Sequence, residues 1–268
     1  MSNDNQPPKS APTDTPAGAK PQKYFVRFSK PEDEQKILDF YDMNAHQNVR
    51  KREADILRNR IEDGSVVLVE DEQGKIVASS ISYPHKTVDS DGDEHIKWQE
   101  VGSTRIVLNG YPGVFDAMVA MQVLRTFLVE PPEDRLVARM HTEPVQKMAE
   151  KLGWRRFTAP EDLIRLQKKS VNPNDQSAAP PDVNWFHMGV EGLPVVAKWM
   201  VETLQNPVLE NRKTGEKIEL DFSKSSFFNM FETEIRHLAK RDFGSPDTPD
   251  MKKGVEQSRN KWLKKFFR

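Results

Sequence analysis

The chain has 268 residues, a formal net charge of −1 and no cysteine. The lack of cysteine excludes disulfide bonds, a thiol nucleophile and cysteine-based zinc sites, and the near-zero charge provides no overall field that would attract nucleic acid. No apolar run approaches the length of a membrane span, and no signal-peptide core stands near the N-terminus. We therefore expect a soluble, cytoplasmic protein, and leave open export by another route.

The first third of the sequence predicts a tail, a strand, two helices and a hairpin. Residues 1–23 are rich in proline and polar residues and hold no apolar pair to seed a core, which indicates a disordered tail. The acidic stretch from Val88 to Glu94 lacks the glutamate that closes a calcium loop, so we interpret it as a solvated hairpin tip. The predicted elements are a strand at 24–28, helices at about 31–43 and 52–62, and paired strands at 65–70 and 75–83.

The stretch from Trp98 to Phe157 predicts a layered α/β unit. Its expected elements are an extended segment (100–108), a glycine turn (109–113), a helix (about 114–129), a strand (135–140), a second helix (144–151) and the start of another strand. A helix that begins at a glycine turn offers unpaired N–H groups and the positive end of its dipole. Such a helix start suits an anion such as a phosphate group.

Beyond residue 169 the sequence predicts a linker and a smaller α+β region. Residues 170–182 have the composition of a linker. The C-terminal extension, 183–257, is expected to hold a strand (183–189), a helix (193–205), a hairpin (208–211 with 217–222) and a helix (226–243). The sequence leaves open whether this extension has a core of its own or packs on the first domain. Residues 258–268 are basic and amphipathic, which suits a protein partner, an anionic membrane surface or packing on the chain itself.

The order of these elements resembles that of the GNAT acyltransferase superfamily, over about residues 24–157. Two motifs carry the resemblance. Gly113-Val-Phe-Asp-Ala-Met118 is similar to the family's glycine-rich helix start, and Ala149-Glu-Lys-Leu-Gly-Trp154 is similar to its Glu-Lys-Leu-Gly-Phe ending. The resemblance implies a GNAT-like α/β (α+β) domain at 24–169, in which helices flank a mixed, mostly antiparallel sheet.

The resemblance also implies an activity, the transfer of an acyl group from acetyl-CoA or another acyl-CoA to a small-molecule or protein amine. The family's carboxylate base lies on the long strand, where Glu100 stands, and Tyr111 is the nearest substitute for its tyrosine acid. Arg105 is expected to bind an acidic substrate group, or to pair with Glu100 or Asp116. His141, near the expected cofactor face, is the second candidate substrate-binding residue. Because the family binds the pyrophosphate on the turn before the central helix, the implied cofactor-binding residues are Leu108, Asn109, Gly110, Gly113, Val114 and Phe115.

The sequence departs from the family pattern at that turn and at the later helix. Aligned on Gly113, it has Gly110 in place of arginine or glutamine and Phe115 at the second small position, while Pro112 removes one N–H donor. Ala149 stands where the family has its tyrosine acid. These departures favour a second hypothesis, a catalytically inactive GNAT-fold module that binds a partner through its C-terminal region. The histidines show no metal-ligand spacing, so no metal site is predicted.

Overall fold

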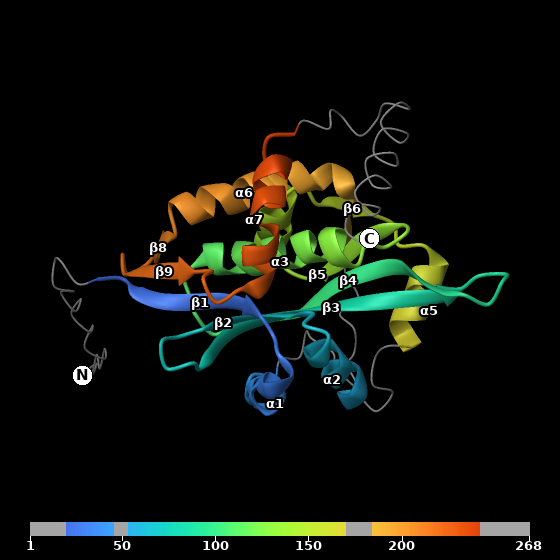
Figure 1. Cartoon of the computed structure of the whole chain (residues 1–268), viewed down its shortest axis with the longest axis horizontal. Coiled ribbons are helices and arrows are strands. Elements are labelled where there is room, and N and C mark those ends of the chain that lie inside the picture. Colours follow the sequence, from blue (N-terminus) through green and yellow to red (C-terminus); the bar gives the residue numbers. More distant parts are fainter. Residues whose placement is uncertain (1–19, 46–52, 170–183, 242–268) are drawn as a thin grey trace, which may run out of the picture.

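A single nine-stranded sheet forms the middle layer of the protein (Figure 1). The computed structural model describes residues 20–45, 53–169 and 184–241. Its strands are β1 (Gln22–Phe28), β2 (Val66–Glu70), β3 (Ile76–Val88), β4 (Glu94–Ile106), β5 (Arg135–Met140), β6 (Arg155–Phe157), β7 (Asn184–Met188), β8 (Val208–Glu210) and β9 (Lys217–Asp221). They lie side by side in the order β6-β7-β5-β4-β3-β2-β1-β9-β8.

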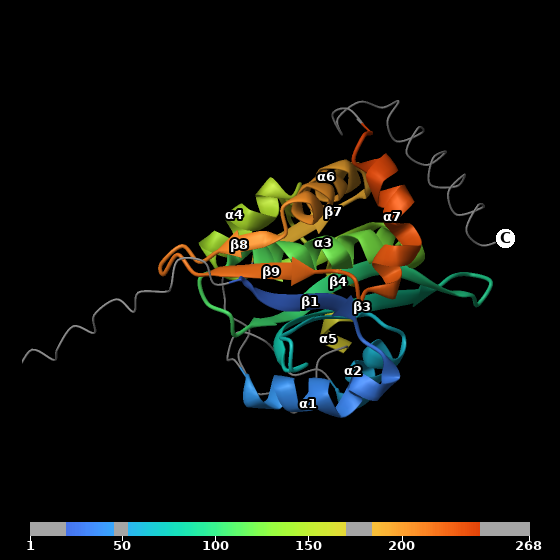
Figure 2. The ribbon, with the colours of Figure 1, turned by 60° about the vertical axis from the view of Figure 1, so that its left-hand side comes forward.

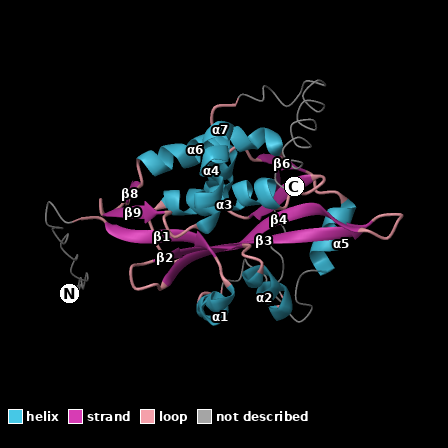
Figure 3. Cartoon of the chain, viewed as in Figure 1, coloured by secondary structure: helices cyan, strands magenta, loops and turns pink. Residues whose placement is uncertain are grey.

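Helices cover both faces of this sheet, which gives three layers (Figures 1 and 3). The helices are α1 (Glu34–Met43), α2 (Ala54–Glu62), α3 (Pro112–Val129), α4 (Glu143–Lys151), α5 (Glu161–Lys169), α6 (Leu193–Gln205) and α7 (Ser226–Leu238). Helices α1, α2 and α5 lie on one face, and α3, α4, α6 and α7 lie on the other; the view turned by 60° shows the same division (Figure 2).

The pairing directions confirm the expected fold class. Within the described chain every strand pairing is antiparallel except two, which join β4 to β5 and β1 to β9. Parallel neighbours need a long crossover connection, and α3 provides the one between β4 and β5. The protein is therefore a mixed, mostly antiparallel α/β structure flanked by helices.

Helix α3 is the core helix of the molecule. Met118, Met121 and Leu124 are fully buried, because the sheet packs on one side of α3 and α6 on another. Gln122 is a fully buried polar residue of α3, and its amide donates hydrogen bonds to the carbonyls of Ser65 and Ser80. By length and composition α3 could also cross a membrane, contrary to the expectation from sequence, but 72% of it is buried inside the protein.

The C-terminal extension shares the core of the first domain, which answers the question that the sequence left open. Strand β7 inserts between β5 and β6, and β9 pairs in parallel with β1. Val196, Ala197 and Met200 of α6 are fully buried in the same hydrophobic cluster as α3. The extension thus completes both ends of the sheet.

Most predicted elements are present, with shifted boundaries. Strand β3 continues to Val88 and β4 begins at Glu94, so the acidic stretch is the tip of a long hairpin. The Asp89 carboxylate accepts hydrogen bonds from the backbone N–H groups of Asp91 and Asp93 within that tip. Helix α3 starts at Pro112, α7 ends at Leu238, and α5 is an element that the sequence analysis does not predict. The terminal segment 258–268, the linker 170–182, most of the tail 1–23 and the end of the extension from residue 242 lie outside the described residues.

Candidate functional site

Strands β4 and β5 run side by side only over part of their length. They pair in parallel from Trp98 with Arg135 to Val101 with Ala138, whereas β4 continues to Ile106. Ligands of open α/β sheets bind outside the carboxyl ends of the strands. The carboxyl end of β4 leads into the turn before α3, and that of β5 leads to the half-buried His141. The topology therefore brings the expected cofactor turn and His141 to the same edge of the sheet.

A bulge in β4 lies just beyond this point. The register with β3 shifts between Ile81, which faces Gly102, and Ser79, which faces Arg105. Ser103 within the bulge has a φ of 49°, in the left-handed region that non-glycine residues rarely adopt. Such a conformation stores roughly 1–3 kcal/mol of strain and is found where the surrounding structure enforces it.

Two tyrosines hold the bulge in place. The Tyr83 hydroxyl on β3 lies 2.8 Å from the Ser103 hydroxyl. The Tyr41 hydroxyl on α1 donates to the Ser103 carbonyl at 2.8 Å and lies 3.0 Å from the Ser79 hydroxyl. Burial raises the pKa of Tyr41 far above its usual 10, so this phenol stays a hydrogen-bond donor at physiological pH.

Glu100 is buried on the face of the sheet that carries Tyr83, its partner across the strands. Only 3% of Glu100 and 3% of His85 is exposed, and Nε2 of His85 lies 2.9 Å from Oε2 of Glu100. Glu100 is therefore a paired interior carboxylate and not a solvent-facing strand residue. A carboxylate joined to an imidazole in this way can accept a proton and pass it on.

Arg105 has a different partner from those that the sequence suggests. Its Nε donates to the carbonyl of Asn44 at 2.8 Å, so the guanidinium joins β4 to the end of α1. Burial lowers the pKa of Arg105 below its usual value, and the nearby Tyr41 and Tyr83 partly offset that effect. Arg105 thus anchors the end of α1 to β4.

The C-terminal hairpin β8–β9 covers the glycine turn before α3. A Cβ atom on Gly113 would lie 2.7 Å from Cδ2 of Leu209, and one on Gly110, whose φ is 90°, would lie 2.6 Å from Nδ2 of Asn211. The Asn211 side-chain amide donates to the carbonyl of Asn109 at 3.0 Å. The space beside the turn that a phosphate group would need is therefore filled by the chain itself.

The other residues expected on this turn point mostly into the protein. Tyr111 precedes α3 as its N-cap residue and is buried, as are Val114 and Phe115, in the main hydrophobic cluster. Leu108 packs against the same cluster. The ring of Phe115 thus contributes to the core.

Asp116, in the second turn of α3, adds a negative charge to this end of the helix. Burial raises its pKa from 3.8 to about 6, and the neighbouring charges of Lys151 and Arg212 act in the opposite direction. Its Oδ1 is buried without a hydrogen-bond partner among the described residues. A carboxylate in this position opposes the binding of an anion.

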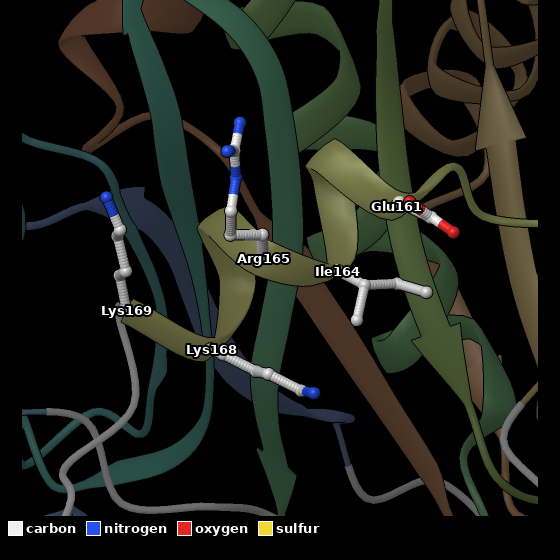
Figure 4. A pocket seen from close by; sticks show the side chains of 5 residues that line it. All are labelled: Glu161, Ile164, Arg165, Lys168 and Lys169. Carbon is white, nitrogen blue, oxygen red and sulfur yellow. The ribbon is translucent and has the colours of Figure 1, made fainter.

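Two surface hollows have linings that include neither Glu100 nor the glycine turn. One, of about 530 Å³, is lined by residues of α5; the other, of about 280 Å³, lies between the end of α6, β9 and the start of α7. Arg165, Lys168 and Lys169 line the first hollow, but their side chains fan out and do not converge on a common point (Figure 4). No group of three or more potential metal ligands occurs in the described ranges.

Sequence reasoning identified Glu100 and the glycine turn but not their neighbours. Counting outward from the hairpin tip at Asp91 pairs Tyr83 with Gln99, because the count misses the register shift between His85 and Lys86 that sets Tyr83 opposite Glu100. No local signal marks the bulge at Ser103. None indicates that Leu209 meets Gly113, because almost a hundred residues separate them in the sequence.

No family model and no curated protein matches this sequence. Many of the similar solved structures are acetyltransferases of the GNAT superfamily. They include Arabidopsis thaliana NAA60 in complex with acetyl-CoA (11% identity, TM-score 0.40, 62% of this chain and 97% of that one). A Drosophila melanogaster polyamine N-acetyltransferase has 11% identity and a TM-score of 0.40, over 61% and 97% of the two chains. A GNAT superfamily phosphinothricin acetyltransferase from Sinorhizobium meliloti, in complex with acetyl-CoA, has 15% identity and a TM-score of 0.40, over 61% and 86%.

Proposed function

We propose that this chain is an acyltransferase that moves an acyl group from an acyl-CoA to an amine, with Glu100 as the proton acceptor. The buried pair of Glu100 and His85, 2.9 Å apart beside the point where β4 leaves β5, is the observation that carries the proposal. An amine becomes a nucleophile only after it loses a proton, and a carboxylate held by an imidazole can take that proton. The resemblance in the order of the elements supports the same reaction class. We further propose a small-molecule amine as the acceptor and the cytoplasm as the location.

The residues implied for acyl-CoA do not fit it in the described arrangement. Leu209 and Asn211 occupy the space beside Gly113 and Gly110, and Asp116 adds an acidic group at the same helix end. Tyr111, the expected acid, is buried at the N-cap of α3. We therefore assign acyl-CoA as a substrate without deriving a step through the covered turn.

The covered turn favours a second candidate function, a catalytically inactive binding or assembly module. In that case the hairpin β8–β9 is a permanent part of the fold, and the buried pair of Glu100 and His85 only stabilises the sheet. The two candidates differ in a simple way, because the second predicts no acyl transfer to any amine.

The release of free CoA from acetyl-CoA, measured with a panel of small amines, tests the proposal. The chain contains no cysteine, so a thiol reagent reports the released CoA without a protein background. We expect turnover by the wild type and a decrease of about 10²- to 10⁴-fold in Glu100→Gln, which removes the base. The matched control is Glu94→Gln, an exposed glutamate at the start of the same strand, which should leave turnover unchanged.

Two results would count against the acyltransferase. The absence of CoA release with every amine and every acyl-CoA tried, in a folded protein, would favour the binding module. Full turnover in Glu100→Gln would retain the reaction class but remove Glu100 from it.

A further inference from the structure

The hairpin β8–β9 docks on the turn before α3 through contacts of three kinds. The first is apolar, since Leu209 lies over Gly113 with no room for a side chain between them. The second is a pair of hydrogen bonds, in which the Asn211 amide donates to the carbonyl of Asn109 at 3.0 Å and the backbone N–H of Arg212 donates to the carbonyl of Gly110 at 3.2 Å. The third is electrostatic attraction between Arg212 and Asp116.

These contacts explain why positions 110 and 113 of the turn are glycines, without reference to a cofactor. A glycine permits close approach of another part of the chain, and in this protein the approaching part is the hairpin. Asn211 is 7% exposed, and its Oδ1 accepts hydrogen bonds from the backbone N–H of Lys213 and, at 3.3 Å, of Thr214. The loop that touches the turn is therefore held in one shape by its own side chain.

The attachment of β8 to the rest of the sheet is slight. It is the outermost strand, and it pairs with β9 over three residues only, Val208 to Glu210. Strand β9 is held independently, through four residue pairs with β1. Within the described chain, β8 and the loop after it are therefore joined to the sheet only through β9, whereas β9 has its own pairing with β1.

We propose that β8 and the loop that follows it form a displaceable plug, which moves away from the turn while β9 stays in place and excludes the phosphate groups of an acyl-CoA from the start of α3 while it is closed. This inference rests on the proposed function and concerns the regulation of the same site. The apparent affinity for acyl-CoA is then the affinity of the open form multiplied by the fraction of molecules that are open. Substitutions that weaken the closed form should tighten binding.

The first test compares CoA binding by calorimetry in the full chain and in an opened variant, Leu209→Ala with Asn211→Ala. These substitutions remove the apolar contact and the side-chain hydrogen bond but leave the turn itself intact. We expect the opened variant to bind CoA at least about tenfold more tightly than the wild type. The matched control is Glu210→Ala, whose side chain alternates to the other side of β8 and should bind as the wild type does.

The second test locks the plug with a disulfide between Gly113→Cys and Leu209→Cys. The chain has no cysteine of its own, and a Cβ on Gly113 lies 3.4 Å from Cγ of Leu209, the position that the Sγ atom of a cysteine at 209 would take, which brings the two side chains within reach of a disulfide. The side chain that obstructs position 113 is Leu209 itself, so the double substitution relieves the crowding. The oxidised protein should not bind CoA, and reduction of the same sample should restore binding.

The outcomes separate this inference from the proposed function. Equal CoA affinity in the wild type, the opened variant and the oxidised protein would overturn the plug, and CoA release with an amine would still stand. No binding by any variant, together with no CoA release, would overturn both. If the opened variant fails to fold, the reversible disulfide decides the matter alone.

Discussion

Nε2 of His85 on β3 and Oε2 of Glu100 on β4 lie 2.9 Å apart, in an interior from which water is almost wholly excluded. Removal of either side chain therefore leaves the other buried without this contact. Substitutions of His85 or Glu100 should therefore change the stability of the fold as well as any proton transfer by Glu100.

Replacing His85 by alanine should lower the free energy of unfolding by about 3 kcal/mol, because it leaves Glu100 buried without its imidazole. Urea denaturation at neutral pH measures this change. His95→Ala provides the control, since His95 is half-exposed and its contact with Glu133 spans 3.2 Å at the surface, where a pair contributes about 0–1 kcal/mol. Equal losses in the two variants would contradict the importance of the interior pair.

At Ser103 a glycine variant should be more stable than an alanine variant, which is the reverse of the usual order within a strand. Ser103→Ala keeps the strained φ of 49° and loses the hydrogen bond to Tyr83, whereas Ser103→Gly also loses the bond but relieves the strain. We expect the glycine variant to be more stable than the alanine variant by about 1 kcal/mol. At the next residue, Thr104, glycine should be less stable than alanine by about 0.5–1 kcal/mol. Thermal unfolding of the four proteins gives the comparison, and the same order at both positions would refute it.

The stability contribution of Asp116 should decrease as the pH rises. Burial raises the pKa of its carboxyl to about 6 in the folded protein, against 3.8 as the ordinary value. Between these two values the folded state binds more protons than the unfolded state, so the free energy of unfolding falls with increasing pH. Asp116→Asn should therefore be more stable than the wild type at pH 7, by up to about 3 kcal/mol, and should lose that advantage below about pH 4. A pH series of urea denaturation curves tests this, and an advantage that does not depend on pH would contradict it.

Asp33 should show the opposite dependence on pH. Burial by itself would raise the pKa of its carboxyl, but hydrogen bonds from Arg27 and from the backbone N–H of Lys30 outweigh that effect and bring the pKa below its usual 3.8. The stability that this group contributes is complete above pH 3.8 and is lost as the pH falls through the lowered pKa. Asp33→Asn should cost about 3 kcal/mol at pH 7, since it takes one carboxylate from the buried Arg27.

The pH series of urea denaturation curves that tests Asp116 also tests Asp33. The penalty of Asp33→Asn should shrink below about pH 4, because the wild-type carboxyl becomes protonated in that range. A penalty that stays constant down to pH 2.5 would contradict this dependence, and a penalty near zero at pH 7 would show that Arg27 relies on Glu70, which it contacts at 2.8 Å, and not on Asp33.

The sequence allowed most of the fold to be predicted because its signals are local. The apolar surface of α3 and the β-branched run of β2, for example, were visible in the sequence. Helix α5 was missed because its short apolar stripe has meaning only beside Trp98 and Phe157, with which Leu163 and Leu166 form a separate small cluster. Such a contact depends on the tertiary arrangement and leaves little trace in a window of nine residues.

The candidate site could be predicted only in part for the same reason. Glu100 was found from its place on the long strand, but its partner His85 depends on the register of a hairpin with two irregularities. The glycines at 110 and 113 were predicted to lie against the phosphate groups of a cofactor, but in the structure it is the chain itself that approaches them. What approaches them, Leu209 and Asn211, comes from a distant segment, and a pattern within the turn cannot distinguish a phosphate from a leucine.

The parallel pairing of β1 with β9 determines when the sheet is completed during synthesis. Strand β1 obtains β2 as a neighbour once residues 66–70 have been made, but its other edge waits for residues 217–221. While the residues between these two segments are synthesised, the nascent chain presents an unpaired strand edge, which can associate with other chains. Correct folding therefore benefits from protection of that edge until β9 has emerged.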